Sequence, residues 1–242
     1  MLNQRSKKLI AGGLSIAIVF ALISFTKLNP EQKLASMKPK NQDVIKLPEP
    51  QTSGGISVEK AISQRRSVRN FSDKPLNLDQ ISQLLWAAQG ITGPEGEKRA
   101  APSAGALYPM ELYVVTGADL KDLEKGVYHY ITEGHKIERV KAKDLRANLS
   151  TAALNQEWVE EAPLSIVITG VYERTTRKYT HHGERYVHIE AGHIAQNLAL
   201  QAESLGLAMV TVGAFQSKQV QKVLDIPEDH QPLYIIPMGY PD

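Results

Sequence analysis

Residues 185–206, RYVHIEAGHIAQNLALQAESLG, form the most apolar helical pattern in this chain. Ala191, Ile194 and Leu198 make one stripe at helical spacing, and further alanines and leucines spread apolar character around the cylinder. A helix that is apolar on most sides is usually buried on most sides. Other parts of the protein must therefore cover it. We expect this helix at the centre of a domain or at a subunit interface, ending at Gly206.

The patterns around this helix alternate between helix and strand. Residues 57–64 and 76–90 indicate helices that begin at the cap candidates Ser57 and Asn77, and the second of them ends at Gly90. One more helix or pair of helices is predicted over 144–162, and strands are predicted over 110–117, 125–131, 135–140, 164–172, 207–215 and 232–240. These elements together predict an α+β layered domain.

The N-terminus has a different character from the rest of the chain. After the basic flank MLNQRSKK, residues 9–25 contain no charge. We expect residues 1–26 to be a signal-anchor, with a cleaved signal peptide as the alternative. Because a basic flank stays in the cytoplasm, the remainder would be membrane-anchored and extracytoplasmic, periplasmic in a bacterium. Residues 27–55, rich in proline and lysine, indicate a flexible linker before a domain over 56–242.

Charge and cysteine content exclude several classes of function. The net charge is +2, but four of the 28 Lys and Arg residues lie in the first thirty positions, which contain no acid. The remaining 24 cations face 26 Asp and Glu residues, a balance of about −2 that does not suit a nucleic-acid binder. The chain has no cysteine, so it has no disulfide framework, thiolate metal site or cysteine nucleophile.

A basic cluster, RRSVRNF, occupies residues 65–71 at a junction between a helix and a turn. Arg65, Arg66 and Arg69 surround Ser67. Guanidinium groups match phosphate oxygens in bidentate geometry, and a hydroxyl or backbone N–H completes such a site. The same pattern is also typical of a solvated surface. The cluster alone therefore leaves both interpretations open.

Three further stretches could carry chemistry. Residues 101–115, APSAGALYPMELYVV, place small residues before a strand, where a backbone can approach a flat ligand; the alternative is an ordinary loop. Residues 174–186 contain Lys178 beside Tyr179, a pair that can exchange protons in a desolvated pocket; the alternative is a solvated basic loop. Residues 210–215, VTVGAF, end a strand at a glycine.

A metal site would have to use His181, His182, His188, Glu190 and His193. The spacing of five residues between His188 and His193 does not place two imidazoles on one helix face. We therefore expect no metal centre.

Taken in chain order, RRSVRNF, PSAGALYPMELYVV, KYTHHGERYVHIEAGHIAQNLALQAESLGLAMVTVGAF and the closing YIIPMGY resemble the nitroreductase-like FMN flavoproteins. They are most similar to the SagB-type dehydrogenase branch, which includes thiazoline and oxazoline oxidases. The resemblance covers residues 56–242. It implies a nitroreductase-like α+β fold with a central mixed or antiparallel sheet flanked by helices. It also implies an obligate homodimer with FMN at the subunit interface, which suits the apolar helix.

The resemblance also implies roles for individual residues. The arginine cluster matches the segment that contacts the FMN phosphate, ribityl chain and flavin edge, the Pro-Ser segment passes along the isoalloxazine, and a strand end presents its backbone to the ring. The expected cofactor-binding residues are Arg65, Arg66, Ser67, Arg69, Pro102, Ser103, Ala104, Gly105, Val212 and Gly213. Lys178 and Tyr179 match the catalytic pair of the azoline-oxidising relatives, in which proton removal assists hydride transfer to the flavin.

The resemblance therefore predicts an FMN-dependent oxidoreductase that works in two half-reactions, with NAD(P)H as a candidate electron donor and a small-molecule or peptide-derived substrate. Two alternatives remain at this level. One is an azoline-type dehydrogenase that acts on peptide-derived heterocycles. The other is a non-catalytic flavin-binding protein at the membrane.

Overall fold

The computed structural model describes residues 44–93, 96, 98–117 and 120–242, all within one unit, Lys40–Asp242. The expected signal-anchor over 1–26 lies outside the described residues. In the ranges that are described, no helix is both long enough and apolar enough to cross a membrane.

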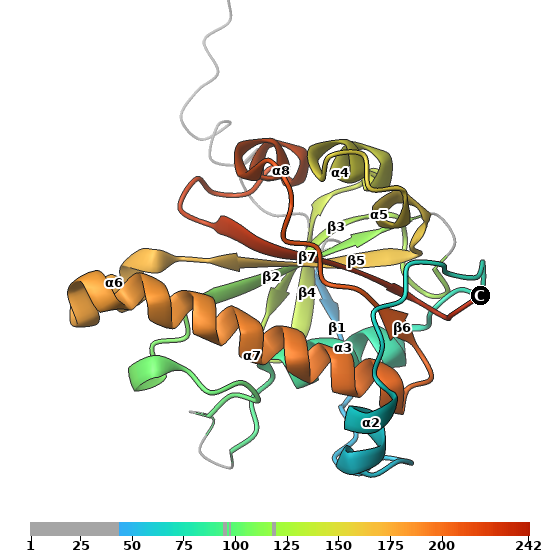
Figure 1. The fold of residues 1–242 in the computed structure, drawn as a ribbon, viewed down its shortest axis with the longest axis horizontal. Coiled ribbons are helices and arrows are strands. Elements are labelled where there is room, and N and C mark those ends of the chain that lie inside the picture. Colours follow the sequence, from blue (N-terminus) through green and yellow to red (C-terminus); the bar gives the residue numbers. More distant parts are fainter. Residues whose placement is uncertain (1–43, 94–95, 97, 118–119) are drawn as a thin grey trace, which may run out of the picture. The chain divides into compact units, whose positions relative to one another are not determined.

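A seven-stranded sheet in the order β1-β4-β3-β2-β5-β7-β6 forms the centre of the described unit (Figure 1). Each neighbouring pair of strands is antiparallel. The strands are β1 (Val44–Lys46), β2 (Met110–Thr116), β3 (Gly126–Ile131), β4 (Lys136–Lys141), β5 (Leu164–Gly170), β6 (Ala208–Met209) and β7 (Gln231–Gly239). The predicted α+β fold with a central antiparallel sheet flanked by helices is thus confirmed.

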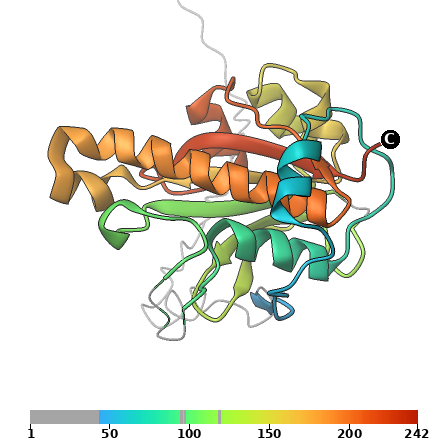
Figure 2. The same cartoon turned by 60° about the horizontal axis from the view of Figure 1, so that its bottom comes forward.

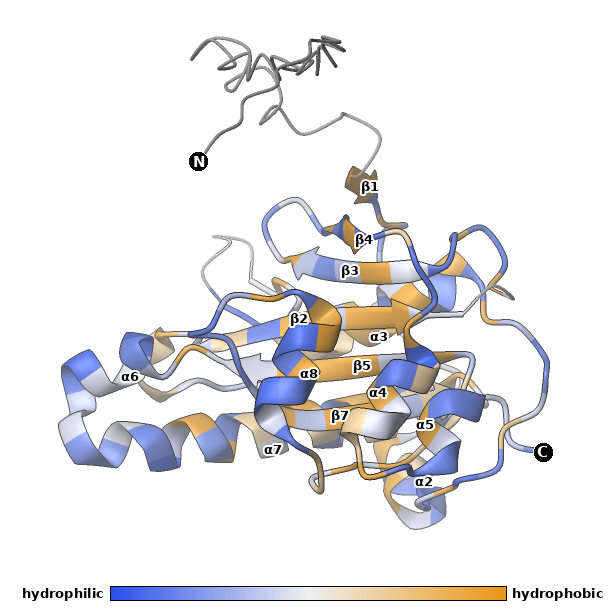
Figure 3. Ribbon diagram, turned by 90° about the horizontal axis from the view of Figure 1, so that it is seen from above, coloured by the Kyte–Doolittle hydropathy of each residue, from blue (hydrophilic) through white to orange (hydrophobic). Residues whose placement is uncertain are grey.

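Helices cover both faces of this sheet. In Figure 1, α4, α5 and α8 lie on one face, whereas α2, α3 and α7 lie on the other. The helices are α2 (Val58–Gln64), α3 (Leu78–Gln89), α4 (Arg146–Ala152), α5 (Glu157–Glu161), α6 (Tyr172–Tyr179), α7 (Gly183–Ser204) and α8 (Ser217–Leu224), with short 3₁₀ turns η1 (Ala104–Ala106) and η2 (Thr180–His182). Every residue of β5 is buried because this strand is covered on both faces, and apolar residues dominate β2 and β5 in Figure 3.

The helix ends follow the predicted caps. The Ser57 side chain accepts a hydrogen bond from the Lys60 backbone N–H at the start of α2. At the start of α3, Asn77 and Gln80 form a capping box, in which each side chain accepts from the backbone N–H of the other. Helix α7 ends just before Gly206, whose φ of +67° is the left-handed conformation that glycine adopts readily.

Helix α7 packs on the sheet with one side and leaves another side exposed. Ile194 and Leu198 are fully buried in the core between the sheet, α3 and α7. On the exposed side Ile189 is 48% accessible, and a Cβ added at Gly192 would meet no atom within 4 Å. Figure 2 shows α2 and α3 beside this helix. A single chain therefore leaves this stripe uncovered, and the expected subunit interface on this helix stays a prediction.

The structure corrects two further expectations. The predicted strand over 207–215 is reduced to Ala208–Met209. Pro237 of β7 accepts a hydrogen bond from Val210 but has no N–H to return, which interrupts the ladder. Residues 174–186 are helical rather than a loop, because α6, η2 and the first turn of α7 follow one another there.

The folded domain also begins earlier than residue 56. Val44–Lys46 pair with β4, and the Leu47 side chain is 2% exposed in the core. The backbone N–H of Gln51 donates to the Gln83 side chain at 2.8 Å. The described part of the expected linker is therefore packed onto the domain, because an edge strand can pair through its backbone whatever its side chains are.

Candidate functional site

The arginine segment leaves α2 and runs beside the strand end that the sequence also assigns to the flavin. The backbone N–H of Val68 donates to the carbonyl oxygen of Met209 at 3.0 Å, and Ser67 forms a parallel bridge with Met209. Further along, Val212 and Ile235 exchange both backbone hydrogen bonds, at 2.8 and 3.0 Å. The structure thus brings these two predicted segments, 65–69 and 212–213, into one region, which we call the arginine group.

Among the described residues, the arginines of this group have no carboxylate partners. Arg66 Nη1 donates to the carbonyl oxygens of Ser63 and Arg65, each at 2.9 Å, at the end of α2. The Arg69 guanidinium lies 5.3 Å from the ring centroid of Trp158, a cation–π contact. Within the described ranges, none of the three arginines forms an ion pair with Asp or Glu. Their positive charge is therefore available to an anion.

A cavity of about 380 Å³ lies beside Gly213. A Cβ at Gly213 would meet only the Tyr234 ring, at 3.8 Å, so the glycine backbone is open to this cavity. His188 of α7 also lines it, and its Nε2 is hydrogen bonded to the Tyr172 hydroxyl. Burial raises the pKa of Tyr172, and the charge of Glu184 adds to the rise. The cavity thus has an open backbone wall and a titratable pair at its edge.

The Pro-Ser segment, residues 102–105, enters a strained turn. The backbone N–H of Tyr108 donates to Ser103 Oγ at 2.9 Å. Gly105, Ala106 and Tyr108 have φ angles of +63°, +54° and +45°. Left-handed conformations are unfavourable for residues other than glycine, and they persist where the surroundings enforce them. This turn therefore depends on contacts from neighbouring elements.

Lys178 and Tyr179, at the end of α6, lie directly on this turn. A Cβ at Gly105 would stand 2.6 Å from the Tyr179 hydroxyl and 3.0 Å from Lys178 Nζ, so both groups occupy space that only glycine leaves free. The Tyr179 ring packs edge-to-face on Tyr186 with centroids 5.1 Å apart. We call this assembly of residues 102–105 with Lys178 and Tyr179 the Pro-Ser group.

Arg174 connects α6 to this group and to the sheet. Its guanidinium donates to the carbonyl oxygen of Tyr108 at 3.1 Å and to the carboxylate of Glu111. His129 is hydrogen bonded to the same carboxylate at 2.7 Å. Burial favours a higher pKa for Glu111, but the His129 hydrogen bond and the Arg174 charge outweigh it and lower that pKa overall. Helix α6, and with it Lys178, is thereby held against the turn.

The arginine group and the Pro-Ser group lie on different sides of α7. His188 and Ala191 line the cavity at Gly213, whereas Glu190 and His193 contact the Pro-Ser segment. At about 3.6 residues per turn, these two pairs project from nearly opposite sides of the helix. The exposed stripe of α7 lies between them. One chain therefore does not bring all the predicted flavin contacts to one place.

Residues 62–240 match the Nitroreductase family model, with the antiparallel sheet and flanking helices described above. This chain belongs to the nitroreductase family. The relatives include the trifolitoxin-processing protein TfxB of Rhizobium leguminosarum bv. trifolii and the microcin B17-processing protein McbC, from the branch that the sequence motifs resemble. The predicted family is thus confirmed.

Two relatives illustrate the range of sequence similarity between this nitroreductase and known proteins. MJ1384 of Methanocaldococcus jannaschii, a protein assigned to the nitroreductases, is 45% identical over 184 residues, which is 76% of this chain and 91% of the relative. The microcin B17-processing protein McbC of Escherichia coli is 28% identical over 164 residues. That alignment covers 65% of this chain and 60% of McbC.

Solved structures show the same nitroreductase fold. A nitroreductase of Ralstonia eutropha JMP134 superposes with a TM-score of 0.72 and 32% identity, over 83% of this chain and 90% of that one. A chain of the E. coli microcin synthetase McbBCD complex, solved with truncated pro-MccB17 bound, superposes with a TM-score of 0.67 and 25% identity. Coverage in that case is 92% of this chain and 86% of the other.

Several residues of the site had no signal in the sequence of this nitroreductase. Arg174 and Trp158 act through tertiary contacts, and nothing in their local spacing indicates their partners. Glu190 and His193 were weighed only as metal ligands. Within the described part of the chain, no group of three or more His, Cys, Asp or Glu could hold a metal ion.

Proposed function

We propose that this protein is an FMN-dependent oxidoreductase whose flavin is held between two copies of the chain. The family supports the broader class, a flavin oxidoreductase of the nitroreductase superfamily. The observation that carries the two-chain site is the position of the predicted flavin contacts on opposite sides of α7, with the exposed stripe between them. A twofold partner on that stripe brings the arginine group of one chain to the Pro-Ser group of the other.

The residues that are present fit FMN. Arg65, Arg66 and Arg69 offer positive charge with no carboxylate competitor among the described residues, which suits a phosphate. In the part of the chain that the structure describes, Trp158 Nε1, beside Arg69, is buried without a hydrogen-bond partner. Gly213 leaves backbone open to a cavity that side chains do not fill. This donor set would hold the phosphate at one end and the ring at the other.

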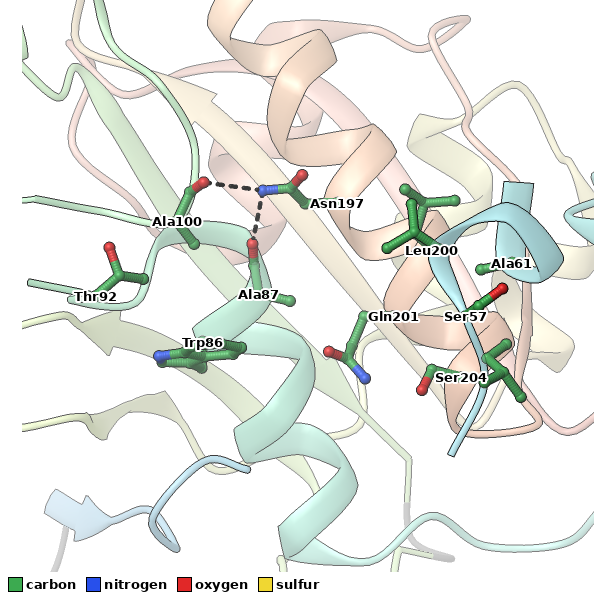
Figure 4. Close-up of a pocket in the computed structure, with 12 residues that line it drawn as sticks. Ser57, Ala61, Trp86, Ala87, Thr92, Ala100, Asn197, Leu200, Gln201 and Ser204 are labelled. Carbon is green, nitrogen blue, oxygen red and sulfur yellow. Dashed lines mark hydrogen bonds between the residues drawn. The ribbon is translucent and has the colours of Figure 1, made fainter. Parts of the chain in front are cut away.

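Apolar surface beside the exposed stripe supports the homodimer. Val58 and Ile62, one turn apart on α2, are 63% and 57% exposed. A groove of about 380 Å³ separates α2 from α3 and α7, with Trp86 and Leu200 in its walls (Figure 4). Leu200 and Ile189 lie on the same side of α7 because eleven residues make just over three turns. A second copy of the chain would cover this apolar surface.

Replacing Ile62 with aspartate is expected to weaken the homodimer at least about thirtyfold, because a charge would be placed in a buried apolar contact. Analytical ultracentrifugation measures the change, and FMN should be lost together with the partner. Leu154→Asp is the matched control, since Leu154 is 53% exposed and follows α4 on the other face of the sheet. An Ile62→Asp protein that remains as dimeric as the Leu154→Asp protein would contradict this interface.

When bound, FMN supplies reversible acceptance of a hydride. The protein's part is to move the accompanying proton and to orient the substrate. Lys178 Nζ and the Tyr179 hydroxyl meet over Gly105, where each can accept or donate a proton. Lys178 is exposed in the single chain, so the partner subunit would exclude water from it.

We rank a general FMN reductase or dehydrogenase first and an azoline-type dehydrogenase of peptide-derived heterocycles second. NAD(P)H is the proposed electron donor for the first, as in the names of the FMN reductase of Bacillus subtilis and the NADPH-flavin oxidoreductase of Vibrio harveyi. The second is favoured by similarity to McbC and to the trifolitoxin-processing protein TfxB, together with the Lys178–Tyr179 pair. The third candidate is a non-catalytic flavin-binding protein.

We also propose that residues 1–26 anchor the domain to a membrane, on its extracytoplasmic side. The basic flank and the uncharged run over 9–25 support this placement. Accessibility of the domain to a protease added outside intact cells tests the proposal. Complete protection in intact cells, with cleavage after lysis, would place the domain in the cytoplasm.

The purified protein is expected to be yellow, with the absorption spectrum of an oxidised flavin, and heat should release FMN rather than FAD. Anaerobic addition of NAD(P)H should bleach the spectrum, and an added acceptor should restore it repeatedly. A colourless protein that FMN does not reconstitute would refute the flavin function. Bound FMN that no panel of donors and acceptors turns over would instead favour the non-catalytic binder.

A further inference from the structure

Three polar side chains of α7 line up along the segment that leads into the Pro-Ser turn. Glu190, His193 and Asn197 have the i, i+3, i+7 spacing of a single helix face. We call these three side chains the α7 polar ladder. Glu190 and His193 are two of the residues that the sequence analysis considered as metal ligands. Asn197 was not singled out from the sequence.

Each side chain of the ladder contacts the backbone or a side chain of residues 100–103. Asn197 Nδ2 donates to the carbonyl oxygens of Ala87, at 3.0 Å, and Ala100, at 3.3 Å (Figure 4). His193 Nδ1 lies 3.3 Å from the carbonyl oxygen of Pro102, and it donates there in the tautomer with a proton on Nδ1. Glu190 lies one turn before His193 on the same face, where the nearby Ser103 hydroxyl acts to lower the pKa of its carboxyl group. The three side chains of the ladder are thus arranged along residues 100–103.

Glu190 differs from the other two residues of the ladder because it is an ionisable carboxylate that is only 2% exposed. When Glu190 is ionised it can only accept, so the Ser103 hydroxyl would be the donor between the two groups. Ser103 Oγ in turn accepts the backbone N–H of Tyr108 at 2.9 Å. A hydrogen bond from Ser103 to Glu190 would connect α7 through Ser103 to the far end of the strained turn.

The groups around Glu190 come from three elements. Gln89 of α3 donates from Nε2 to Glu190 Oε1 at 3.3 Å, and Arg99 Nη1 donates to Gln89 Oε1 at 3.4 Å. His193 approaches from α7 itself. Burial raises the pKa of Glu190, against the hydrogen bonds from Ser103 and Gln89 and the charges of Arg99 and His193. No direct ion pair compensates the carboxylate within the described residues.

A carboxylate at a buried position destabilises the fold unless its interactions compensate for the burial. Desolvation penalises its charge, and a neutral side chain of similar size would avoid this cost. The carboxylate does, however, provide strong acceptor sites for Ser103 and Gln89 together. The turn that it holds contains left-handed Ala106 and Tyr108, whose conformations need external support.

We propose that Glu190, the first residue of the α7 polar ladder, is a positioning residue that holds residues 102–105 in the conformation that receives the flavin and that contacts Lys178 and Tyr179. The proposal rests on the proposed function for its consequence, the binding of FMN. Its structural part concerns only the conformational order of the turn, which does not depend on flavin binding. The two parts can therefore be tested separately.

The first test needs no flavin. Hydrogen–deuterium exchange of the full-length apoprotein should show amides of residues 103–108 exchanging at least about tenfold faster in Glu190→Ala, with exchange along α7 and β5 unchanged. Glu190→Gln keeps one acceptor oxygen and should fall between that variant and the unaltered protein. Glu203→Gln, on the same helix but outside the ladder, should match the unaltered protein. Unchanged exchange over residues 103–108 in both Glu190 variants would overturn the proposal.

The second test is a double-mutant cycle for FMN affinity between Glu190→Gln and Ser103→Ala. Coupled residues should give a double variant no weaker than the weaker single variant, because either change breaks the same chain. Fully additive losses would contradict the proposal. If the unaltered protein does not bind FMN, the proposed function fails while the exchange result still decides the ladder. If Glu190→Ala does not fold, the isosteric Glu190→Gln and Ser103→Ala proteins carry both tests.

Discussion

Replacing Lys178 with alanine is expected to lower turnover about 100-fold to 10,000-fold, the range for loss of a positioned proton-transfer group. The Lys178 ammonium and the Tyr179 hydroxyl converge on the space over Gly105, and no other lysine shares that position among the described residues. FMN should remain bound, since the arginine group that would hold its phosphate lies on the other side of α7. Stopped-flow absorbance of the flavin separates its reduction from its reoxidation and shows which half-reaction slows.

Two variants sharpen this result. Tyr179→Phe keeps the ring packing on Tyr186 but removes the hydroxyl, so it should slow the same half-reaction without loss of stability. Lys218→Ala removes an exposed lysine from α8, outside both groups, and should leave turnover unchanged. Equal turnover in Lys178→Ala and Lys218→Ala would exclude Lys178 from the chemistry. An effect confined to peptide-derived heterocycles would favour the azoline-type reaction over a general reductase.

Replacing Arg65 with alanine is expected to weaken FMN binding about 10-fold to 100-fold, the loss that follows removal of a charge-assisted hydrogen bond. Riboflavin, which lacks the phosphate, should bind equally well to the variant and to the unaltered protein. Fluorescence titration of the apoprotein with each flavin measures both affinities. The ratio between them isolates the contact with phosphate from any general damage to the site.

The fold should survive this change. Arg65 is half-buried at the end of α2, where its backbone N–H donates to Ala61, and alanine keeps that bond. Arg177→Ala is the matched control, because Arg177 pairs with Glu173 on the surface of α6. An unchanged ratio of FMN to riboflavin affinity in Arg65→Ala would remove Arg65 from the phosphate site. A drop in both affinities would indicate that Arg65 acts on the ring or on the fold.

Local sequence patterns were sufficient to predict the positions of most helices and strands. Ser57 and Asn77 mark helix starts because their side chains accept backbone N–H groups within the same turn, which involves only neighbouring residues. Gly206 marks the end of α7 for a similarly local reason, its left-handed φ. The division of 144–162 into α4 and α5 also lay within the prediction.

Long-range contacts account for what the patterns did not show. Val44–Lys46 pair with β4, a strand about ninety residues away. The proline-rich sequence around them indicated a flexible linker, because nothing local shows this pairing. The short β6 follows from Pro237 on its neighbour, not from its own residues. Arg174 of α6 pairs with Glu111 near the start of the central strand β2, a contact that no spacing within α6 indicates.

The sequence by itself determined the family, the order of the elements and the residue types offered to a flavin, because these depend on motifs and on periodicity along the chain. Only the tertiary structure decided how those residues are grouped. Helix α7 separates the arginine group from the Pro-Ser group, since its buried side must pack on the sheet and its remaining sides then face different neighbours. The same packing buries Glu190 on the side of α7 where His193 contacts Pro102, and we propose that its carboxylate holds the turn there.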